Sequence, residues 1–398
     1  MPKKNIQKNA PPGIVPPPPQ PLSEEPNTES SSSPAATVVV GRRKSPTGWS
    51  RWRWWIIGGS GALLLGAAVF VGWVIFQGPT STDHSNSAPL SNNNAAAVSL
   101  VPRQIDGVLV APDKANTRIY AVMVENLIQA RPQSGLDKAS LVFETLAEGG
   151  ITRFMALFPV GVEVKEIGPV RSARPYYVHW AEEFDALYVH AGGSPQALDY
   201  LRSSHPHTVD FNQFYHGGNF IRDDSRAAPH NLYTSTTKLY LGIQQVAPDL
   251  KPNFASWSYK DEPSIDARPT DTKDLVIDFS SFNYKVTYKY DSVQNQYQRF
   301  IGDKPHVTRD GNTIYTKNVV IEFAKITLYP NEKERLDIQT EGTGKMLLVR
   351  DGQVITGTWK KDSPAGRTQW LDDQGQTLSL DRGTTWVEVL PEGRTITY

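Results

Sequence analysis

Arginine, glycine and histidine residues gather in one stretch of the chain, residues 125–235, beside short apolar runs. Arginine binds phosphate and carboxylate groups through a planar fork of N–H donors, a geometry that lysine does not have. Glycine lets backbone N–H groups approach a bound anion closely. These residue types therefore predict an anion-binding site. Its candidate residues are Arg131, Glu148, Gly149, Gly150, Arg153, Arg171, Ser172, Arg174, His190, Gly193, Ser194, Arg222, Arg226, His230 and Asn231.

Several of these candidates stand where a helix is predicted to begin. Arg171 and Arg174 precede a helix that opens at Pro175, and Ser194 is the expected N-cap of a second helix. The N-terminus of a helix carries free N–H groups and the positive end of the helix dipole, so it favours negative charge. Because strand and helix ends gather along one edge of an α/β sheet, we expect the candidate segments to line one concave surface.

The same arginines have a second interpretation, in which they form internal salt bridges. Acidic residues occur in or near the same segments, namely Glu125, Glu144, Glu148, Asp223 and Asp224. Structural ion pairs perturb charges as ligand sites do. Both interpretations stay open from the sequence alone.

Other chemistries fit the residues less well. His205, His207, Asp210 and His216 are ligand types for zinc or another divalent metal, but their polar loop favours solvated side chains. Ser194 with a histidine does not stand in a nucleophile elbow. The tryptophans of the C-terminal part could stack on sugars, although tryptophan in a small β domain is more often a core residue. We expect no metal and no cofactor, and we assign no catalytic residue.

Apolar runs bounded by Gly, Pro or charge alternate with helical patterns between residues 105 and 248. Such runs are typical of buried strands. Strands are predicted at 119–124, 141–143, 154–158 and 186–189, and helices at 175–184, 194–202 and 234–246. Strands interleaved with helices predict an α/β domain with a mixed sheet over 105–248.

The pattern changes in the last third of the chain. Residues 249–272 are polar and Pro-rich, which is typical of an interdomain linker. Residues 273–398 contain alternating strand patterns and tight turns such as Asp310-Gly311 and Asp351-Gly352. We therefore predict a small β-rich C-terminal domain over 273–398 that folds separately from the α/β domain.

The N-terminal quarter predicts a membrane anchor. Residues 54–76 form a run of 23 residues without a charge, long enough to cross a bilayer as one transmembrane helix. Basic residues flank this run only on its N-terminal side, so residues 1–53 are expected to be cytoplasmic. A cleaved signal peptide would have a shorter apolar region. Residues 1–53 are expected to be a disordered tail and 77–104 a flexible stalk, and the C-terminal domains should lie outside the cell membrane.

Charge and cysteine content exclude several classes of protein. The chain has 41 basic and 41 acidic residues, of which residues 1–76 hold 8 and 3, so 77–398 carry a net charge of −5. This part lacks the basic character of nucleic-acid-binding proteins, and we expect no nucleic-acid partner. The absence of cysteine excludes disulfides, thiolate metal sites and the lipidated cysteine of lipoproteins.

Longer strings of residues carry a specific resemblance. GPVRSARP at 168–175 and HAGGSPQA at 190–197 resemble the N-terminal domain of the YerB-like family of bacterial envelope proteins. The strings GTGKM, GTW and GTTW, which begin at Gly342, Gly357 and Gly383, resemble the second domain of that family. The similarity covers about residues 105–395. It implies an extracytoplasmic location and two domains but no reaction, and this chain departs from lipoprotein members in having no cysteine.

These features predict a membrane-anchored, extracytoplasmic protein of the bacterial cell envelope. Its Arg/Gly-rich cleft would bind an anionic envelope ligand, and the protein would act as a binding or scaffolding module that docks an envelope protein partner. The alternative is an enzyme acting on phosphorylated or lipid-linked cell-wall precursors. That alternative rests on a layout similar to LytR–CpsA–Psr phosphotransferases, in architecture only. A divalent ion beside Asp223 and Asp224 would favour the enzyme, and arginines all paired with acidic residues would favour the scaffold.

Overall fold

Residues 99–203, 207–330, 332 and 334–398 are described by the computed structural model. The predicted transmembrane helix at 54–76, the predicted cytoplasmic tail and most of the predicted stalk lie outside these residues. Within the described residues, no helix has both the length and the apolar character needed to cross a membrane.

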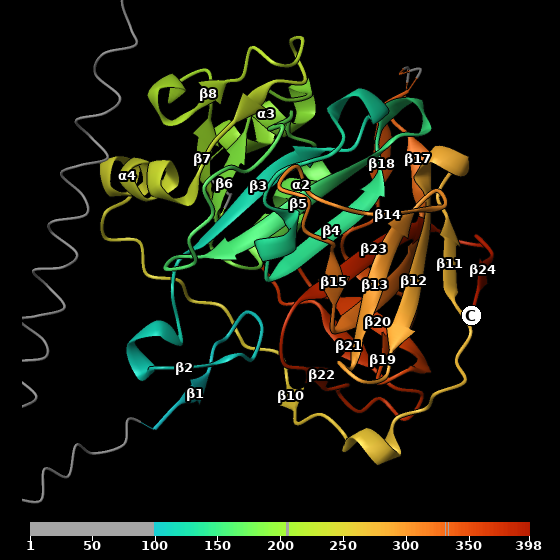
Figure 1. The fold of residues 1–398 in the computed structure, drawn as a ribbon. Helices are drawn as coiled ribbons and strands as arrows, with labels where there is room; N and C mark the ends of the chain where they lie inside the picture. The colour runs from blue at the N-terminus through green and yellow to red at the C-terminus, as the bar shows by residue number, and fades with distance from the viewer. Residues whose placement is uncertain (1–98, 204–206, 331, 333) are drawn as a thin grey trace, which may run out of the picture. The chain divides into compact units, whose positions relative to one another are not determined.

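A mixed sheet of ten strands dominates the described residues (Figure 1). In sheet order the strands are β21 (Gln369–Leu371), β20 (Gln353–Lys361), β19 (Gly342–Arg350), β16 (Asn318–Ala324), β23 (Thr385–Pro391), β4 (Leu141–Leu146), β5 (Thr152–Pro159), β3 (Ile119–Glu125), β6 (Leu187–His190) and β7 (Val209–Asn212). β5 runs antiparallel to both of its neighbours, whereas β3, β6 and β7 are parallel to one another. The mixed sheet predicted for the N-terminal part is therefore present.

A second sheet is built from C-terminal strands alone. Its order is β14 (Lys304–Pro305), β13 (Gln296–Ile301), β12 (Lys285–Asp291), β11 (Leu275–Asp278) and β24 (Ile396–Thr397), and β15 (Tyr315–Thr316) also pairs with β13. The two-stranded pairs are β1 (Val101–Pro102) with β2 (Leu109–Val110), β8 (Ile221–Arg222) with β9 (Leu232–Tyr233), β10 (Tyr259–Lys260) with β22 (Leu380–Asp381), and β17 (Ile326–Leu328) with β18 (Leu336–Ile338). The described residues from 273 onward contain strands and no α-helix, in line with the β-rich pattern.

Local sequence sets where the helices of the described residues begin. These helices are α2 (Pro175–Glu182), α3 (Pro195–Arg202) and α4 (Thr236–Val246). Proline occupies the start of α2 and of α3, where its missing N–H costs nothing. The hydroxyls of Ser194 and Ser235 cap α3 and α4 by accepting from backbone N–H groups of the first turn.

Both faces of the large sheet are covered, which explains why its central strands read as continuous apolar runs. Along β3, Tyr120 and Val122 belong to one buried cluster, while Ala121 and Met123 belong to the other. The buried side chains of α2 pack in the cluster with Met123. Those of α4 and of the second sheet pack in the cluster with Tyr120.

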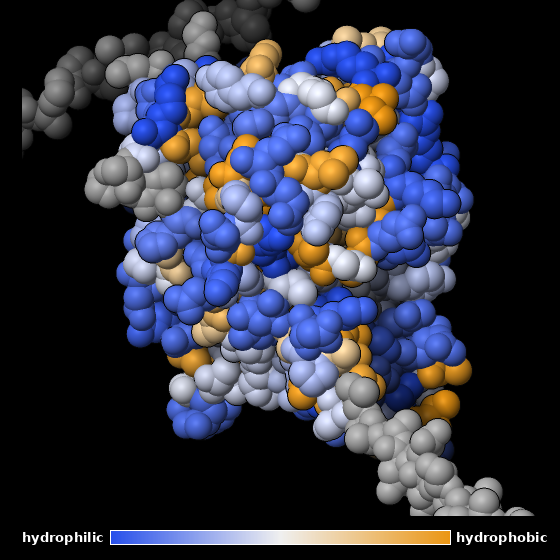
Figure 2. Space-filling model, turned by 90° about the vertical axis from the view of Figure 1, so that its left-hand side faces the viewer, coloured by the Kyte–Doolittle hydropathy of each residue, from blue (hydrophilic) through white to orange (hydrophobic). Residues whose placement is uncertain are grey.

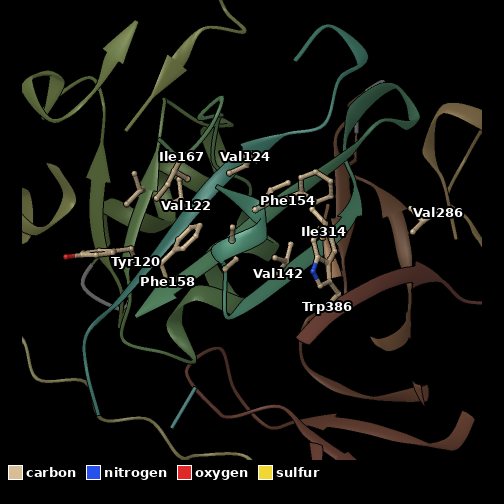
Figure 3. Packing of buried hydrophobic residues seen from close by; sticks show 14 of the residues in the cluster. Tyr120, Val122, Val124, Val142, Phe154, Phe158, Ile167, Val286, Ile314 and Trp386 are labelled. Carbon is tan, nitrogen blue, oxygen red and sulfur yellow. The ribbon is translucent and has the colours of Figure 1, made fainter. Parts of the chain in front are cut away.

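The two predicted domains share the large sheet and its core. Strand β23, near the C-terminus, lies parallel to β4, and β16 follows on the other side of β23. Figure 3 shows Trp386 and Ile314 in the same cluster as Val142 and Phe154. The described residues from 99 onward belong to one compact unit. The expectation that the C-terminal part folds separately is therefore wrong, because β23 and β16 extend the N-terminal sheet.

The segment predicted as a linker, 249–272, is anchored in this core as well. Phe254 and Trp257 are buried, and the ring of Trp257 stacks on that of Trp370 with centroids 4.4 Å apart. Aromatic side chains within a polar stretch thus fix the segment against the sheet. Trp359, Trp370 and Trp386 are all buried core residues and are not arranged to stack on a sugar.

Candidate anion-binding site

The candidate segments meet at one edge of the large sheet. Strands β3, β4 and β6 end at this edge and β5 begins there, since β5 is antiparallel to β3 and β4. The segment before α2 joins them, because Val170 bridges to Val124 and Ala173 bridges to Gly193. Residues far apart in the sequence are therefore neighbours here.

One acidic residue, Glu148, holds two of the candidate arginines. It follows β4 in a turn in which Gly149 and Gly150 take positive φ angles of 66° and 70°. Its carboxylate accepts hydrogen bonds from Nε and Nη2 of Arg174, the second at 2.7 Å, and lies 3.8 Å from Nη2 of the buried Arg153. Burial raises the pKa of Glu148, but the hydrogen bonds and charge of Arg174 outweigh burial and lower that pKa below its usual range.

A second acidic residue, Glu125, lies at the end of β3 beneath two partly exposed basic side chains. Its Oε1 is 3.1 Å from Nε of Arg171, and its Oε2 is 2.9 Å from Nδ1 of His230. Glu125 is only 2% exposed, whereas Arg171 is 22% exposed. The salt-bridge interpretation therefore holds for Arg153, Arg171 and Arg174.

Three further candidate arginines form no ion pair with an acidic side chain within the part of the chain that the structure describes, and the guanidinium carbon of Arg131 lies 5.0 Å from the ring centre of Tyr284. Arg131 donates to the side chain and the backbone oxygen of Asn126, each at 2.9 Å, and to the backbone oxygen of Asn283 at 2.9 Å. Arg222 donates to Oδ1 of Asn231 at 2.8 Å. Burial lowers the pKa of Arg131 below its usual range, so this cation is partly removed from water.

The third of these arginines, Arg226, fixes the backbone around Arg131. Its Nη1 donates to the backbone oxygen of Ala130 at 2.6 Å and its Nη2 donates to that of Pro132 at 2.7 Å. The guanidinium of Arg226 therefore lies against the backbone on both sides of Arg131.

Other candidates make structural contacts. Ser172 donates to a backbone oxygen at 2.9 Å, and the Oγ of Ser194 accepts from the backbone N–H of Ala197 at 3.3 Å as the cap of α3. A Cβ at Gly193 would lie 3.1 Å from that of Ala173, so the small residue permits the bridge between these two segments. These contacts account for the three residues without a ligand.

His190 is buried at the end of β6, and both of its ring nitrogens have partners. Nδ1 is 2.7 Å from the backbone oxygen of Gly192, and Nε2 is 2.7 Å from Oδ1 of Asp210. Neither nitrogen is free to activate Ser194, while His230 faces Glu125. The described residues thus hold no serine–histidine pair at this edge. They also contain no group of three or more His, Asp and Glu side chains placed to hold a metal ion.

A cluster of fully buried charge was missed from the sequence. Arg299 on β13, Glu144 on β4 and Glu388 on β23 are all 0% exposed. Arg299 donates from Nη2 to Glu144 and from Nε to the hydroxyl of Tyr288 at 3.1 Å, and its Nε lies 4.0 Å from Glu388. Burial, with the neighbouring charge of Glu144, raises the pKa of Glu388 well above its usual range. Burial therefore favours the protonated form of Glu388.

The sequence did contain a signal for this cluster. Glu144 and Glu388 each interrupt an otherwise apolar strand, LVFETL and TWVEVLP. In the register of β4 and β23 they are direct neighbours. A carboxyl group in the middle of a buried strand requires a partner, and that partner is Arg299.

The buried cluster continues toward Arg131 through His306 and Gln133. Nδ1 of His306 accepts from Arg299, and its Nε2 donates to Oε1 of Gln133 at 3.1 Å. Burial and the adjacent Arg299 lower the pKa of His306 well below its usual range, so the ring is neutral. Gln133 in turn donates to Oδ1 of Asn126 at 2.9 Å, the same oxygen that Arg131 contacts.

A cavity of about 620 Å³ opens beside Arg131. Arg131 and Gln133 line it from the N-terminal part, and Phe282, Lys304 and His306 line it from the C-terminal part. The cavity therefore lies where the two predicted domains meet.

Known proteins match both parts of the chain. Residues 106–249 match the family described as "Protein of unknown function (DUF3048) N-terminal domain", and residues 275–387 match its C-terminal domain. The protein of Bacillus subtilis named "Putative lipoprotein YerB" is 35% identical over 282 residues, which is 69% of this chain and 82% of YerB. The crystal structure of YerB from Bacillus subtilis has a TM-score of 0.67 at 32% identity and covers 75% of this chain and 100% of that chain. The chain therefore belongs to the YerB-like (DUF3048) family, as its strings of residues indicated.

Proposed function

We propose that the chain is a membrane-anchored protein of the cell envelope whose folded part lies outside the cytoplasm. The name of its relative YerB describes a lipoprotein, a class of protein held at a membrane by a lipid on cysteine. The sequence contains no cysteine to carry such a lipid. The apolar stretch at 54–76 is long enough to replace it.

We propose further that the described part binds an anionic envelope ligand at Arg131, Arg222 and Arg226. The observation that carries this proposal is that none of these arginines forms an ion pair with a described acidic side chain, although the charge of the buried Glu144 acts on Arg131 and offsets part of the lowering of its pKa by burial. Arg131 is partly removed from water, which costs free energy that a bound anion would offset, whereas Arg222 is exposed and offers its charge from the surface. Arg131 uses three of the five N–H donors of a guanidinium, which leaves two for a ligand.

The paired arginines have a different role in this proposal. Glu148 and Glu125 hold Arg153, Arg174 and Arg171 in place, so these residues fix the shape of the edge. Docking of an envelope protein partner by the same edge would use the same excess of positive charge.

An enzyme acting on phosphorylated or lipid-linked cell-wall precursors is the alternative, and the acidic residues do not favour it. Asp223, one of the two carboxylates expected beside a divalent ion, accepts from the backbone N–H of Ser225 at 2.8 Å and from Arg309. These hydrogen bonds lower the pKa of Asp223 to about 2. A carboxylate so occupied has fewer lone pairs to offer a metal ion.

Titration with inorganic phosphate tests the binding proposal. The described residues from 99 onward belong to one compact unit, and the matched YerB structure has about the same extent, so a fragment of residues 93–398 suits calorimetry or NMR. Arg131→Gln and Arg222→Gln should each weaken phosphate binding about tenfold or more, since a hydrogen bond to a charged group contributes roughly 1.5–3 kcal/mol.

Arg202→Gln is the matched control, because it removes the same charge from a side chain that is 62% exposed and lies at the far end of α3. Thermal melts of each variant separate lost binding from lost folding. Unchanged phosphate affinity in folded Arg131→Gln and Arg222→Gln proteins would refute the proposal.

A further inference from the structure

The cavity beside Arg131 is larger and more apolar than a small anion requires. Its volume of about 620 Å³ lies in the range of roughly 300–1,000 Å³ typical of pockets for organic ligands. Its apolar lining residues are Ile128, Pro132, Phe282, Ile301, Pro305 and Val307.

Two of these apolar side chains are exposed where they meet the cavity. Ile128 is 48% exposed and Phe282 is 56% exposed. On the face of the molecule seen in Figure 2, hydrophilic side chains predominate and apolar ones form small separate groups. Exposed apolar side chains around a cavity are typical of a binding site rather than of an ordinary surface.

The charge of the cavity wall is positive. Arg131 forms no ion pair with an acidic side chain among the described residues, and the exposed Lys304 adds a second cation. The acidic residue of the lining, Asp303, lies 3.6 Å from Nζ of Lys285 and is therefore partly neutralised. Gln133 and His306 are held in place by the buried cluster, so the wall that they form is fixed.

We infer that this cavity binds the apolar part of an amphipathic anion, a phosphate or similar group on a hydrocarbon chain, with the charged group at Arg131. The inference rests on the proposed function, because it takes Arg131 as a contact of the anion. It adds the class of ligand and the place of its apolar part.

A series of alkyl phosphates tests the inference. Affinities of ethyl, butyl and hexyl phosphate for residues 93–398 are measured by calorimetry below the concentrations at which micelles form. Each methylene group buried in the cavity should raise the affinity about three- to fourfold. Hexyl phosphate should therefore bind at least tenfold more tightly than ethyl phosphate.

Variants at the rim of the cavity test where the hydrocarbon chain of the ligand binds. Ile128→Ser and Phe282→Ser should remove most of the gain from ethyl to hexyl phosphate and leave the affinity for ethyl phosphate unchanged. Both side chains are about half exposed, so these changes leave the core intact. Ile265→Ser, at an isoleucine that is 55% exposed in the 249–272 segment, is the matched control and should keep the full gain.

The outcomes separate this inference from the proposed function. Arg131-dependent phosphate binding with no gain from chain length would overturn the inference and leave the proposed function standing. A chain-length gain that persists in Arg131→Gln would also overturn it, because the apolar part would then bind without the anion contact. If none of the phosphates binds, both proposals fail.

A second arm distinguishes a membrane lipid from a soluble amphiphile as the source of this chemistry. Residues 93–398 are sedimented with phosphatidylcholine vesicles that contain phosphatidic acid or lack it. Cosedimentation that requires phosphatidic acid and is lost in Ile128→Ser supports the cavity with a bilayer lipid as ligand. Binding of hexyl phosphate without cosedimentation supports it with a soluble ligand.

Discussion

Replacing Arg299 by methionine should lower the free energy of unfolding by about 3–5 kcal/mol. Methionine fills much of the same volume, so the loss arises mainly from charge. Arg299 is 0% exposed, forms an ion pair with Glu144, and places its guanidinium carbon 4.4 Å from the ring centre of Trp386. Its removal leaves the carboxylate of Glu144 buried without a counter-charge.

Replacing Glu144 by glutamine should cost less, about 1–3 kcal/mol, although it breaks the same ion pair. Glu388 lies 4.0 Å from Arg299, and burial together with Glu144 raises the pKa of Glu388, which favours its protonated form. Once residue 144 is neutral, Glu388 can release this proton and balance the charge of Arg299. The cluster contains a second carboxyl group that can ionise, but it contains no second arginine.

Urea denaturation of residues 93–398 at pH 7, followed by tryptophan fluorescence, measures these costs. The double variant Arg299→Met/Glu144→Gln should be less destabilised than the sum of the single variants, by roughly 0.5–3 kcal/mol. Equal costs for the two single variants would refute the proposal that Glu388 ionises and balances the charge of Arg299 when residue 144 is neutral. A cost below about 1 kcal/mol for Arg299→Met would refute the charge argument itself.

Two further predictions concern Glu322 and Ser194. Burial raises the pKa of Glu322 to about 7, although Trp370 donates to it at 2.7 Å, so the folded state prefers the protonated form. Its cost to stability is absent below pH 4.5 and grows as pH rises toward 7, so Glu322→Gln should gain roughly 3 kcal/mol at pH 8 and nothing at pH 4 in thermal melts. Ser194→Ala should lose about 1 kcal/mol, since the cap on the N–H of Ala197 disappears, and should keep its phosphate affinity. A normal melting temperature with weakened phosphate binding would instead make Ser194 a ligand residue.

Individual elements of this fold could be predicted because their signals are local. The helix predicted at 194–202 is observed as α3, since Ser194 and Pro195 mark its start within a few residues. The run at 119–124 is observed as β3, because an apolar segment of that length bounded by polar residues has few alternatives.

The arrangement of the strands could not be predicted in the same way. Thr145 on β4 and Val389 on β23 are joined by a hydrogen bond across 244 residues of sequence. Strands paired at that distance have no connecting turn whose residues could reveal them. The Pro-rich 249–272 segment indicated a domain boundary. The pairing of β4 with β23, which joins the two parts in one sheet, has no local signal in the sequence.

The candidate site shows the same limit. Residue types predicted positive charge at the edge, but Arg171 and Arg226 look alike in the sequence. Only the fold gives Arg171 a buried carboxylate in Glu125 and gives Arg226 two backbone oxygens. Which arginine is left for a ligand therefore depends on contacts between distant segments.

The proposed site needs both parts of the chain, because each part supplies one wall of the cavity. The N-terminal part alone supplies Arg131 and Gln133, which form one wall of the cavity. The opposite wall, with Phe282, Lys304 and His306, comes from the C-terminal part, and His306 is fixed by the same buried cluster that joins β4, β13 and β23. In the proposed function the N-terminal and C-terminal parts therefore form a single binding unit. A substitution that loosens the buried cluster would deform the cavity although the substituted residue does not contact the ligand.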